Sequence, residues 1–107
     1  MANFVVLFED EPSLAELVRE HHMAEHLAFL GRHAAVRAAG PLQDAADGTP
    51  AGGLWLVEAA DPAEVAALVR ADPFWPTGLR RSARILAWRQ VHGVRTMPPG
   101  LKQAEGR

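Results

Sequence analysis

The 107-residue chain is long enough for one domain with a hydrophobic core, and hydrophobic residues make up 49% of it. Its 13 acidic and 11 basic residues give a net charge of −2, which leaves no surplus of positive charge for binding nucleic acid or an anionic membrane. The chain contains no cysteine, which excludes disulfides, thiolate catalysis and cysteine-ligated metals.

The first apolar run predicts a strand over residues 4–8. Its sequence, Phe-Val-Val-Leu-Phe, is β-branched and aromatic, and it ends at Glu9. No basic segment precedes it, and five residues are too few for a signal peptide or a membrane span. We therefore expect a cytoplasmic protein that does not bind membranes.

A long helix is predicted from about Ser13 to about His33. Pro12 suits a first helical turn, Ser13 can cap the helix, and the acidic residues 9–11 complement the positive end of the helix dipole. Gly31 weakens the last turn. The expected apolar stripe consists mainly of Leu14, Leu17, Val18, Leu27, Phe29 and Leu30.

Two strands and a loop follow this helix. Residues 36–42 form the second predicted strand, and because Pro41 cannot donate to a ladder, the strand lies at an edge or ends there. Residues 43–53, rich in Asp, Gly and Ala, are predicted to return the chain antiparallel to a third strand at 54–57.

The second helix begins after Asp61, an N-cap residue followed by Pro62 at the first helical position. It ends near Ala71, because the residue before Pro73 is biased out of helical geometry. Residues 82–91 form the last predicted strand, and residues 92–107 lack periodicity. We expect one domain over residues 1–91 and a loosely held tail over 92–107.

The order strand, helix, strand, strand, helix, strand predicts a ferredoxin-like α+β fold: a four-stranded antiparallel sheet with two helices on one face. Alternate residues of the strands are apolar on both faces, as in Val5 and Leu7 against Val6 and Phe8. Two helices cover only one face, so the other face also needs a cover. We expect a homodimer in which the same face of a second copy supplies it.

The segment 19–29 holds three of the five histidines. His22 and His26 are four residues apart, which on a helix puts both rings on one face, with Arg19 a turn away. The carboxylate that we expect to meet this face is Asp72. A carboxylate that contacts a histidine orients the ring and raises its basicity, which makes a general base.

Three short motifs carry a resemblance to a known family: His-Leu-Ala-Phe-Leu at 26–30, Ala-Gly-Pro-Leu at 39–42 and Ala-Asp-Pro-Phe at 71–74. With these motifs in this order, residues 3–91 resemble the YCII-related proteins of the dimeric α+β barrel superfamily. The resemblance implies a site that pairs the helical histidine with the aspartate of Asp-Pro-Phe, here His26 and Asp72. Chloromuconolactone dehalogenase is a relative with an assigned reaction.

Two features depart from the family pattern. An arginine often found shortly before the histidine is replaced by Met23, and Arg19 is the nearest candidate to take its place. The segment between His26 and Gly40 is short, so His22 could hold the role expected of His26. We expect His26 and Asp72 to be catalytic, and the expected substrate-binding residues are Arg19, His22, Phe74 and Trp75.

Simpler roles stay open for these residues. Asp72 could cap the turn that follows it. His22 and His26 could ligate a metal, but no third ligand has a diagnostic spacing, and we expect no metal. No phosphate-binding glycine pattern is present, and we expect no cofactor. Core packing is the alternative to an aromatic pocket for Trp55, Phe74, Trp75 and Trp88.

Two hypotheses of function remain. In the first, the protein is a cofactor-free isomerase, lyase or dehalogenase-like enzyme in which His26, oriented by Asp72, transfers a proton on a small polar molecule. In the second, the same site binds a small metabolite without turnover, and the protein is a sensor or accessory module. A protonated His26 would then hold an anion instead of acting as a base.

Overall fold

The computed structural model describes residues 1–93. Of the tail expected over 92–107, residues 94–107 lie outside the described residues, so the division into domain and tail stays a prediction. The elements in chain order are β1 (Ala2–Asp10), α1 (Pro12–Arg32), β2 (Val36–Gln43), β3 (Pro50–Ala59), α2 (Pro62–Ala71), the short 3-10 helix η1 (Trp75–Thr77) and β4 (Arg80–Trp88).

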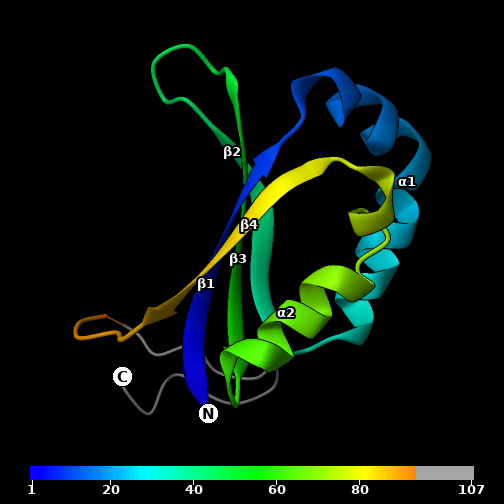
Figure 1. Ribbon diagram of the computed structural model, residues 1–107. Coiled ribbons are helices and arrows are strands. Elements are labelled where there is room, and N and C mark those ends of the chain that lie inside the picture. The colour runs from blue at the N-terminus through cyan, green and yellow to red at the C-terminus, as the bar shows by residue number, and fades with distance from the viewer. Residues whose placement is uncertain (94–107) are drawn as a thin grey trace.

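The four strands form one antiparallel sheet in the order β2-β3-β1-β4. Figure 1 shows α1 and α2 on the same side of this sheet, while the opposite side carries no helix. The predicted ferredoxin-like α+β fold is therefore confirmed. As expected from Pro41, β2 is an edge strand, and the last strand pairs beside the first.

The beginning of α1 differs from the prediction in its cap. Glu11 is the N-cap residue, and its carboxylate accepts hydrogen bonds from the N–H and the hydroxyl of Ser13, at 3.4 and 3.0 Å. The helix starts at Pro12, so Ser13 already lies inside the first turn and its N–H is one of the groups that need a partner.

Two leucines of the expected apolar stripe are on the wrong side of α1. Leu17 is 54% exposed and Leu27 is 59% exposed, whereas Val18, His26 and Phe29 are buried. At 100° per residue, the two leucines fall outside the arc that the three buried side chains define. No helix in the described part of the chain is long and apolar enough to cross a membrane.

The second helix forms as the sequence predicts. Asp61 caps it by accepting a hydrogen bond from the N–H of Glu64 at 2.9 Å, and the Glu64 carboxylate accepts the N–H of Ala60, the residue before the cap. The two bonds satisfy one backbone donor inside the helix and one just before it. The helix ends at Ala71, two residues before Pro73.

Most strand boundaries differ from the sequence prediction: β1 is longer by two residues at each end, and β2 and β3 end one and two residues later. β3 begins at Pro50, because its pairing with β2 continues to Gln43, and the loop between them is correspondingly short. β4 begins at Arg80 instead of residue 82. It ends at Trp88 instead of residue 91, because β1, its only partner strand in the described sheet, supplies its last paired residue at Asn3.

The core lies between the helices and one face of the sheet. Its members from the sheet are the alternating residues of β1 and β3, which pack against Phe29 of α1 and Val65 and Val69 of α2. The middle of the other face carries apolar side chains that are only partly buried in the single chain, and Asn3, Glu9 and Arg84 lie on the same face. These apolar side chains include Val5, Leu7, Leu54, Leu56 and Leu86.

Gly52 gives a test of this packing. Its φ is 92°, and a Cβ at this position would overlap the backbone carbonyl of Phe8 on the neighbouring strand. We expect Gly52→Ala to lower the free energy of unfolding by more than about 2 kcal/mol, measured by urea denaturation. Gly31→Ala is the matched control: it lies in a helix with nothing within 4 Å of the new Cβ. It should leave stability unchanged or raise it by up to about 1 kcal/mol, and an equal loss in both variants would contradict the packing.

Candidate active site

His26 is placed by the amphipathic character of α1. It lies three residues before Phe29 and eight after Val18, and these three are the buried positions of the helix. Only 7% of His26 is exposed. The imidazole is therefore held within the helix layer and cannot rotate freely into solvent.

Asp72 is placed by the end of α2. It is the residue after the last helical position, and Pro73 favours its extended backbone, with φ −64° and ψ 133°. Its side-chain Oδ1 accepts the N–H of Phe74 at 3.1 Å, and its carbonyl accepts the N–H of Trp75 at 2.8 Å. The capping role left open by the sequence is thus present in the structure.

The same oxygen of Asp72 also contacts His26. The distance between Nδ1 of His26 and Oδ1 of Asp72 is 2.8 Å, although the two residues are 46 positions apart. Asp72 is 3% exposed, so this is a buried hydrogen bond. The predicted meeting of the two side chains is confirmed.

The hydrogen bond determines what the other ring nitrogen can do. A carboxylate only accepts, so the neutral imidazole carries its proton on Nδ1 and a lone pair on Nε2. Within residues 1–93, no hydrogen bond joins Nε2 to a protein group. Nε2 is therefore the atom of this pair that can accept a proton from a bound molecule.

Phe74 covers one face of the imidazole. The two rings are stacked with centres 3.9 Å apart and an angle of 8° between their planes. Phe74 also packs with Val18 and Leu79 in a small core cluster, which Met23 joins from α1. The ring of His26 is thus fixed by a hydrogen bond at its edge and by an aromatic ring on its face.

The other expected site residues lie outside this pair. His22 bonds to Glu25 at 3.1 Å on the exposed surface of α1, not to Asp72. Arg19 is exposed, and Trp75 of η1 is 37% exposed. A role for these three residues and for Phe74 in substrate binding stays a prediction. Of the remaining aromatic residues, Trp55 belongs to the core and Trp88 is 40% exposed.

Arg80 is the residue near the pair that sequence reasoning did not single out. Its guanidinium carbon lies 5.4 Å from the centre of the Phe74 ring, and its Nη1 bonds to Asp10 at 3.0 Å. In the sequence it is only a basic residue shortly before a predicted strand. An exposed position was the natural expectation for such a residue, because arginine is rarely buried.

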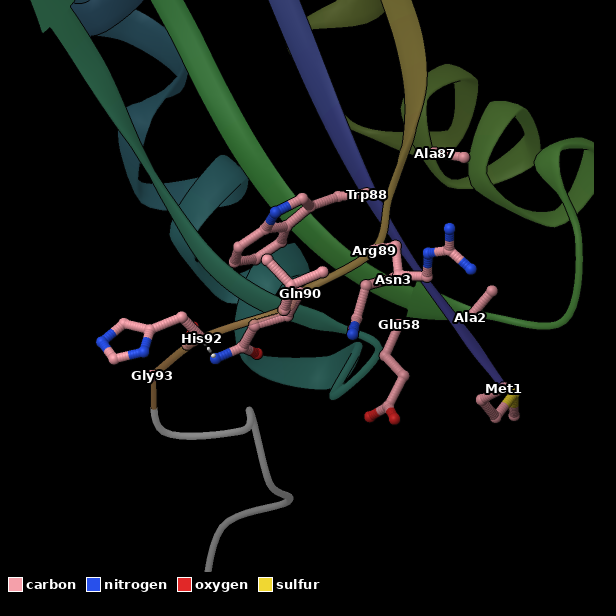
Figure 2. Close-up of a pocket in the computed structure, with 11 residues that line it drawn as sticks. Met1, Ala2, Asn3, Glu58, Ala87, Trp88, Arg89, Gln90, His92 and Gly93 are labelled. Carbon is pink, nitrogen blue, oxygen red and sulfur yellow. Dashed lines mark hydrogen bonds between the residues drawn. The ribbon is translucent and has the colours of Figure 1, made fainter.

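A surface hollow occurs elsewhere in the described structure. It lies around the start of β1 and the end of β4, and Figure 2 shows Asn3, Glu58, Trp88, Gln90 and His92 at its lining. None of the lining residues belongs to the His26 site. Within residues 1–93, no three His, Cys, Asp or Glu side chains come together in a way that could hold a metal ion.

The fold and the buried pair define this protein as a ferredoxin-like α+β domain with a histidine–carboxylate site. The model of the YCII-related domain matches residues 2–89. The chain belongs to the YCII-related family, as the three motifs indicated.

One solved structure is similar in both fold and sequence. It is TftG, the 5-chloro-2-hydroxyhydroquinone dehydrochlorinase from Burkholderia phenoliruptrix AC1100, in complex with 2,5-dihydroxybenzoquinone. The TM-score is 0.70 at 31% identity, over 85% of this chain and 95% of that chain. A protein of Arabidopsis thaliana aligns with a TM-score of 0.46 at 11% identity, over 87% of this chain and 98% of that chain, which is too weak to carry an argument. No curated protein matches this sequence.

The tautomer of His26 tests the geometry directly. We expect the neutral ring to carry its proton on Nδ1, because Asp72 accepts there, whereas a free histidine favours Nε2. Long-range ¹H–¹⁵N correlation spectra distinguish the two forms. Asp72→Ala should return His26 to the Nε2–H form and leave the exposed His21 unchanged. A wild-type protein with the neutral proton on Nε2 would refute the assignment.

Proposed function

We propose that this protein is a cofactor-free, dehalogenase-like lyase or isomerase for a small polar molecule, with His26 as general base and Asp72 as the residue that orients it. The observation that carries the proposal is the buried 2.8 Å hydrogen bond between Nδ1 of His26 and Oδ1 of Asp72. It leaves Nε2 as a fixed acceptor on a ring whose face is covered by Phe74.

The chemistry needs only proton transfer. Nε2 takes a proton from a hydroxyl or a carbon acid of the substrate, and the freed electron pair forms a new double bond. In an elimination the leaving group departs as an anion, so the substrate loses HX and neither oxidant nor reductant is required. In an isomerisation the imidazolium returns the proton at another atom.

Asp72 supports this step in two ways. Its carboxylate holds the ring in the tautomer that presents the lone pair of Nε2, and its negative charge stabilises the imidazolium once the proton has moved. Because both partners are buried, the attraction is not weakened by water as it would be at the surface. The carboxylate thus faces the ring edge opposite to the one that takes the proton.

The similarity to TftG supports the reaction class. That protein is a dehydrochlorinase whose structure contains 2,5-dihydroxybenzoquinone, a small flat ring with polar substituents. At 31% identity we extend to this chain the class of reaction, loss of HX from a small hydroxylated molecule, and not the particular substrate.

A non-catalytic module is the second candidate function. The observation that favours it is the separate surface hollow, which contains none of the proposed catalytic residues. A metabolite could bind there, or beside a protonated His26, without being turned over. The cytoplasmic location expected from the sequence stays a prediction in either case.

Turnover and variants of the pair test the enzyme proposal. Candidates come from a thermal-shift screen of small polar compounds that includes chlorinated hydroxyhydroquinones, and halide release reports elimination. We expect His26→Gln and Asp72→Ala to abolish turnover, and Asp72→Asn to reduce it by about 10²–10⁴-fold, because the amide oxygen can keep both hydrogen bonds while the charge is lost.

His22→Ala is the control for the histidine, since this side chain pairs with Glu25 on the surface. It should retain most of the activity. Undiminished halide release in His26→Gln would refute the assigned base. A compound that binds the wild type tightly but is never converted would leave the binding module as the function.

We also propose that two copies pack through the helix-free face of the sheet. The support is the row of apolar side chains on this face, including Val5, Leu7 and Leu56, which the single chain only partly buries. If the same face of a second copy packs against it, one interface covers the apolar face of both copies, as in a two-fold dimer. The helix layer with His26 lies on the opposite face of the sheet, away from this contact.

Sedimentation velocity tests this arrangement. We expect a dimer at micromolar concentration, with an interface of roughly 2,000 Å² or more. Leu56→Glu should dissociate or precipitate it, because a carboxylate buried in the interface has no partner. Ala67→Glu, on the exposed side of α2, is the matched control and should remain dimeric. A wild-type monomer at these concentrations would rule out the dimer.

A further inference from the structure

Arg80 is a cation inside the helix-covered face of the sheet. It is the first residue of β4, and only 8% of its side chain is exposed. The ladder between β1 and β4 shifts between Glu9 and Asp10, so that Ser82 pairs with Glu9 and Arg80 pairs with Asp10. Arg81 is the extra residue of this bulge, and its side chain is 62% exposed. The bulge thus directs Arg80 inward.

The guanidinium has more donors than the described protein satisfies. Nη1 donates to both carboxylate oxygens of Asp10, at 3.0 and 3.2 Å. Within residues 1–93, no hydrogen bond engages Nε or Nη2, and Nε is sealed from solvent without a partner. Nη2, unlike Nε, is not fully buried. Nη2 therefore keeps donors that can reach a bound molecule, whereas the buried Nε cannot.

The residues around Arg80 accommodate its charged side chain. Its guanidinium carbon lies 4.0 Å from the centre of the Phe8 ring, whose face attracts a cation. A Cβ on Gly53 would come within 3.2 Å of Nη1, so the glycine leaves the space that the guanidinium fills.

Phe74 links the guanidinium to the imidazole. The ring centre of Phe74 is 5.4 Å from the guanidinium carbon and 3.9 Å from the imidazole centre. The sum of these two distances is the largest possible separation of the cation from His26. A single six-membered ring with polar groups at opposite ends can span such a separation through its hydrogen bonds.

We propose that Arg80 is the anion-binding residue of the His26 site, and that its ligands are small planar molecules with an ionised ring oxygen. Nη2 donates to that oxygen, while the opposite end of the ring approaches Nε2 of His26. This inference extends the proposed function. It rests on that function only because it takes the molecule bound by Arg80 to be the substrate of His26. Asp10 holds the guanidinium from its other side without occupying this edge.

Binding of one anionic probe and its neutral analogue tests the inference. The probe is 2,5-dihydroxybenzoquinone, which is ionised at neutral pH, and the control ligand is 2,5-dimethoxy-1,4-benzoquinone, which has the same ring without the charge. In isothermal titration calorimetry we expect the wild type to bind the anion at least about tenfold more tightly than the neutral ring, as a charge-assisted hydrogen bond provides. Equal binding, or no binding of the anion at millimolar concentration, would overturn the inference.

Variants assign the preference to Arg80. Arg80→Gln should weaken anion binding about tenfold or more and leave binding of the neutral ring unchanged. Asp10→Asn breaks the same ion pair but keeps the guanidinium, so it should bind the anion at least as tightly as the wild type. Arg81→Gln, the exposed neighbour, should have no effect. If Arg80→Gln weakens binding of the neutral ring as much as binding of the anion, the arginine is only structural and the inference fails.

His26→Gln separates this inference from the proposed function. Anion preference that survives in His26→Gln assigns the charge recognition to Arg80, even if no compound is ever turned over. Preference that disappears in His26→Gln and persists in Arg80→Gln would assign it to a protonated imidazole and overturn the inference, whatever the outcome of the turnover assay.

Discussion

The hydrogen bond between His26 and Asp72 joins the middle of α1 to the residue that ends α2. Both side chains are almost fully buried, so removal of either one leaves a polar group without water or a partner. The oxygen that binds the imidazole also accepts the N–H of Phe74. One carboxylate oxygen therefore fixes the turn before β4, the stacking of Phe74 and the direction of Nε2 together.

The two apolar faces of the sheet separate assembly from chemistry. The helix-covered face holds the core and the His26 site, and Figure 1 shows that the other face is left without a helix. A self-association through that other face would bury apolar surface without touching the imidazole.

Irregular backbone gathers where Arg80 crosses the core face. The bulge in β4 turns this side chain inward. On β3, which pairs with β1, a side chain at Gly52 would collide with the carbonyl of Phe8, and one at Gly53 would crowd the guanidinium. Regular pairing would have pointed Arg80 outward, where its charge is easily solvated. Local departures of this kind, with a buried cation as the result, are typical of positions kept for function.

The sequence by itself determined the order of the elements, because periodicity and the prolines around α2 act locally, and its motifs indicated that His26 and Asp72 belong together. Only the tertiary structure decided that His26 and not His22 meets the carboxylate, because the two share a helix face and their packing partners are distant in sequence. The same holds for Arg80. Its inward direction comes from a one-residue shift between β1 and β4, and a strand's own alternation carries no information about such a shift.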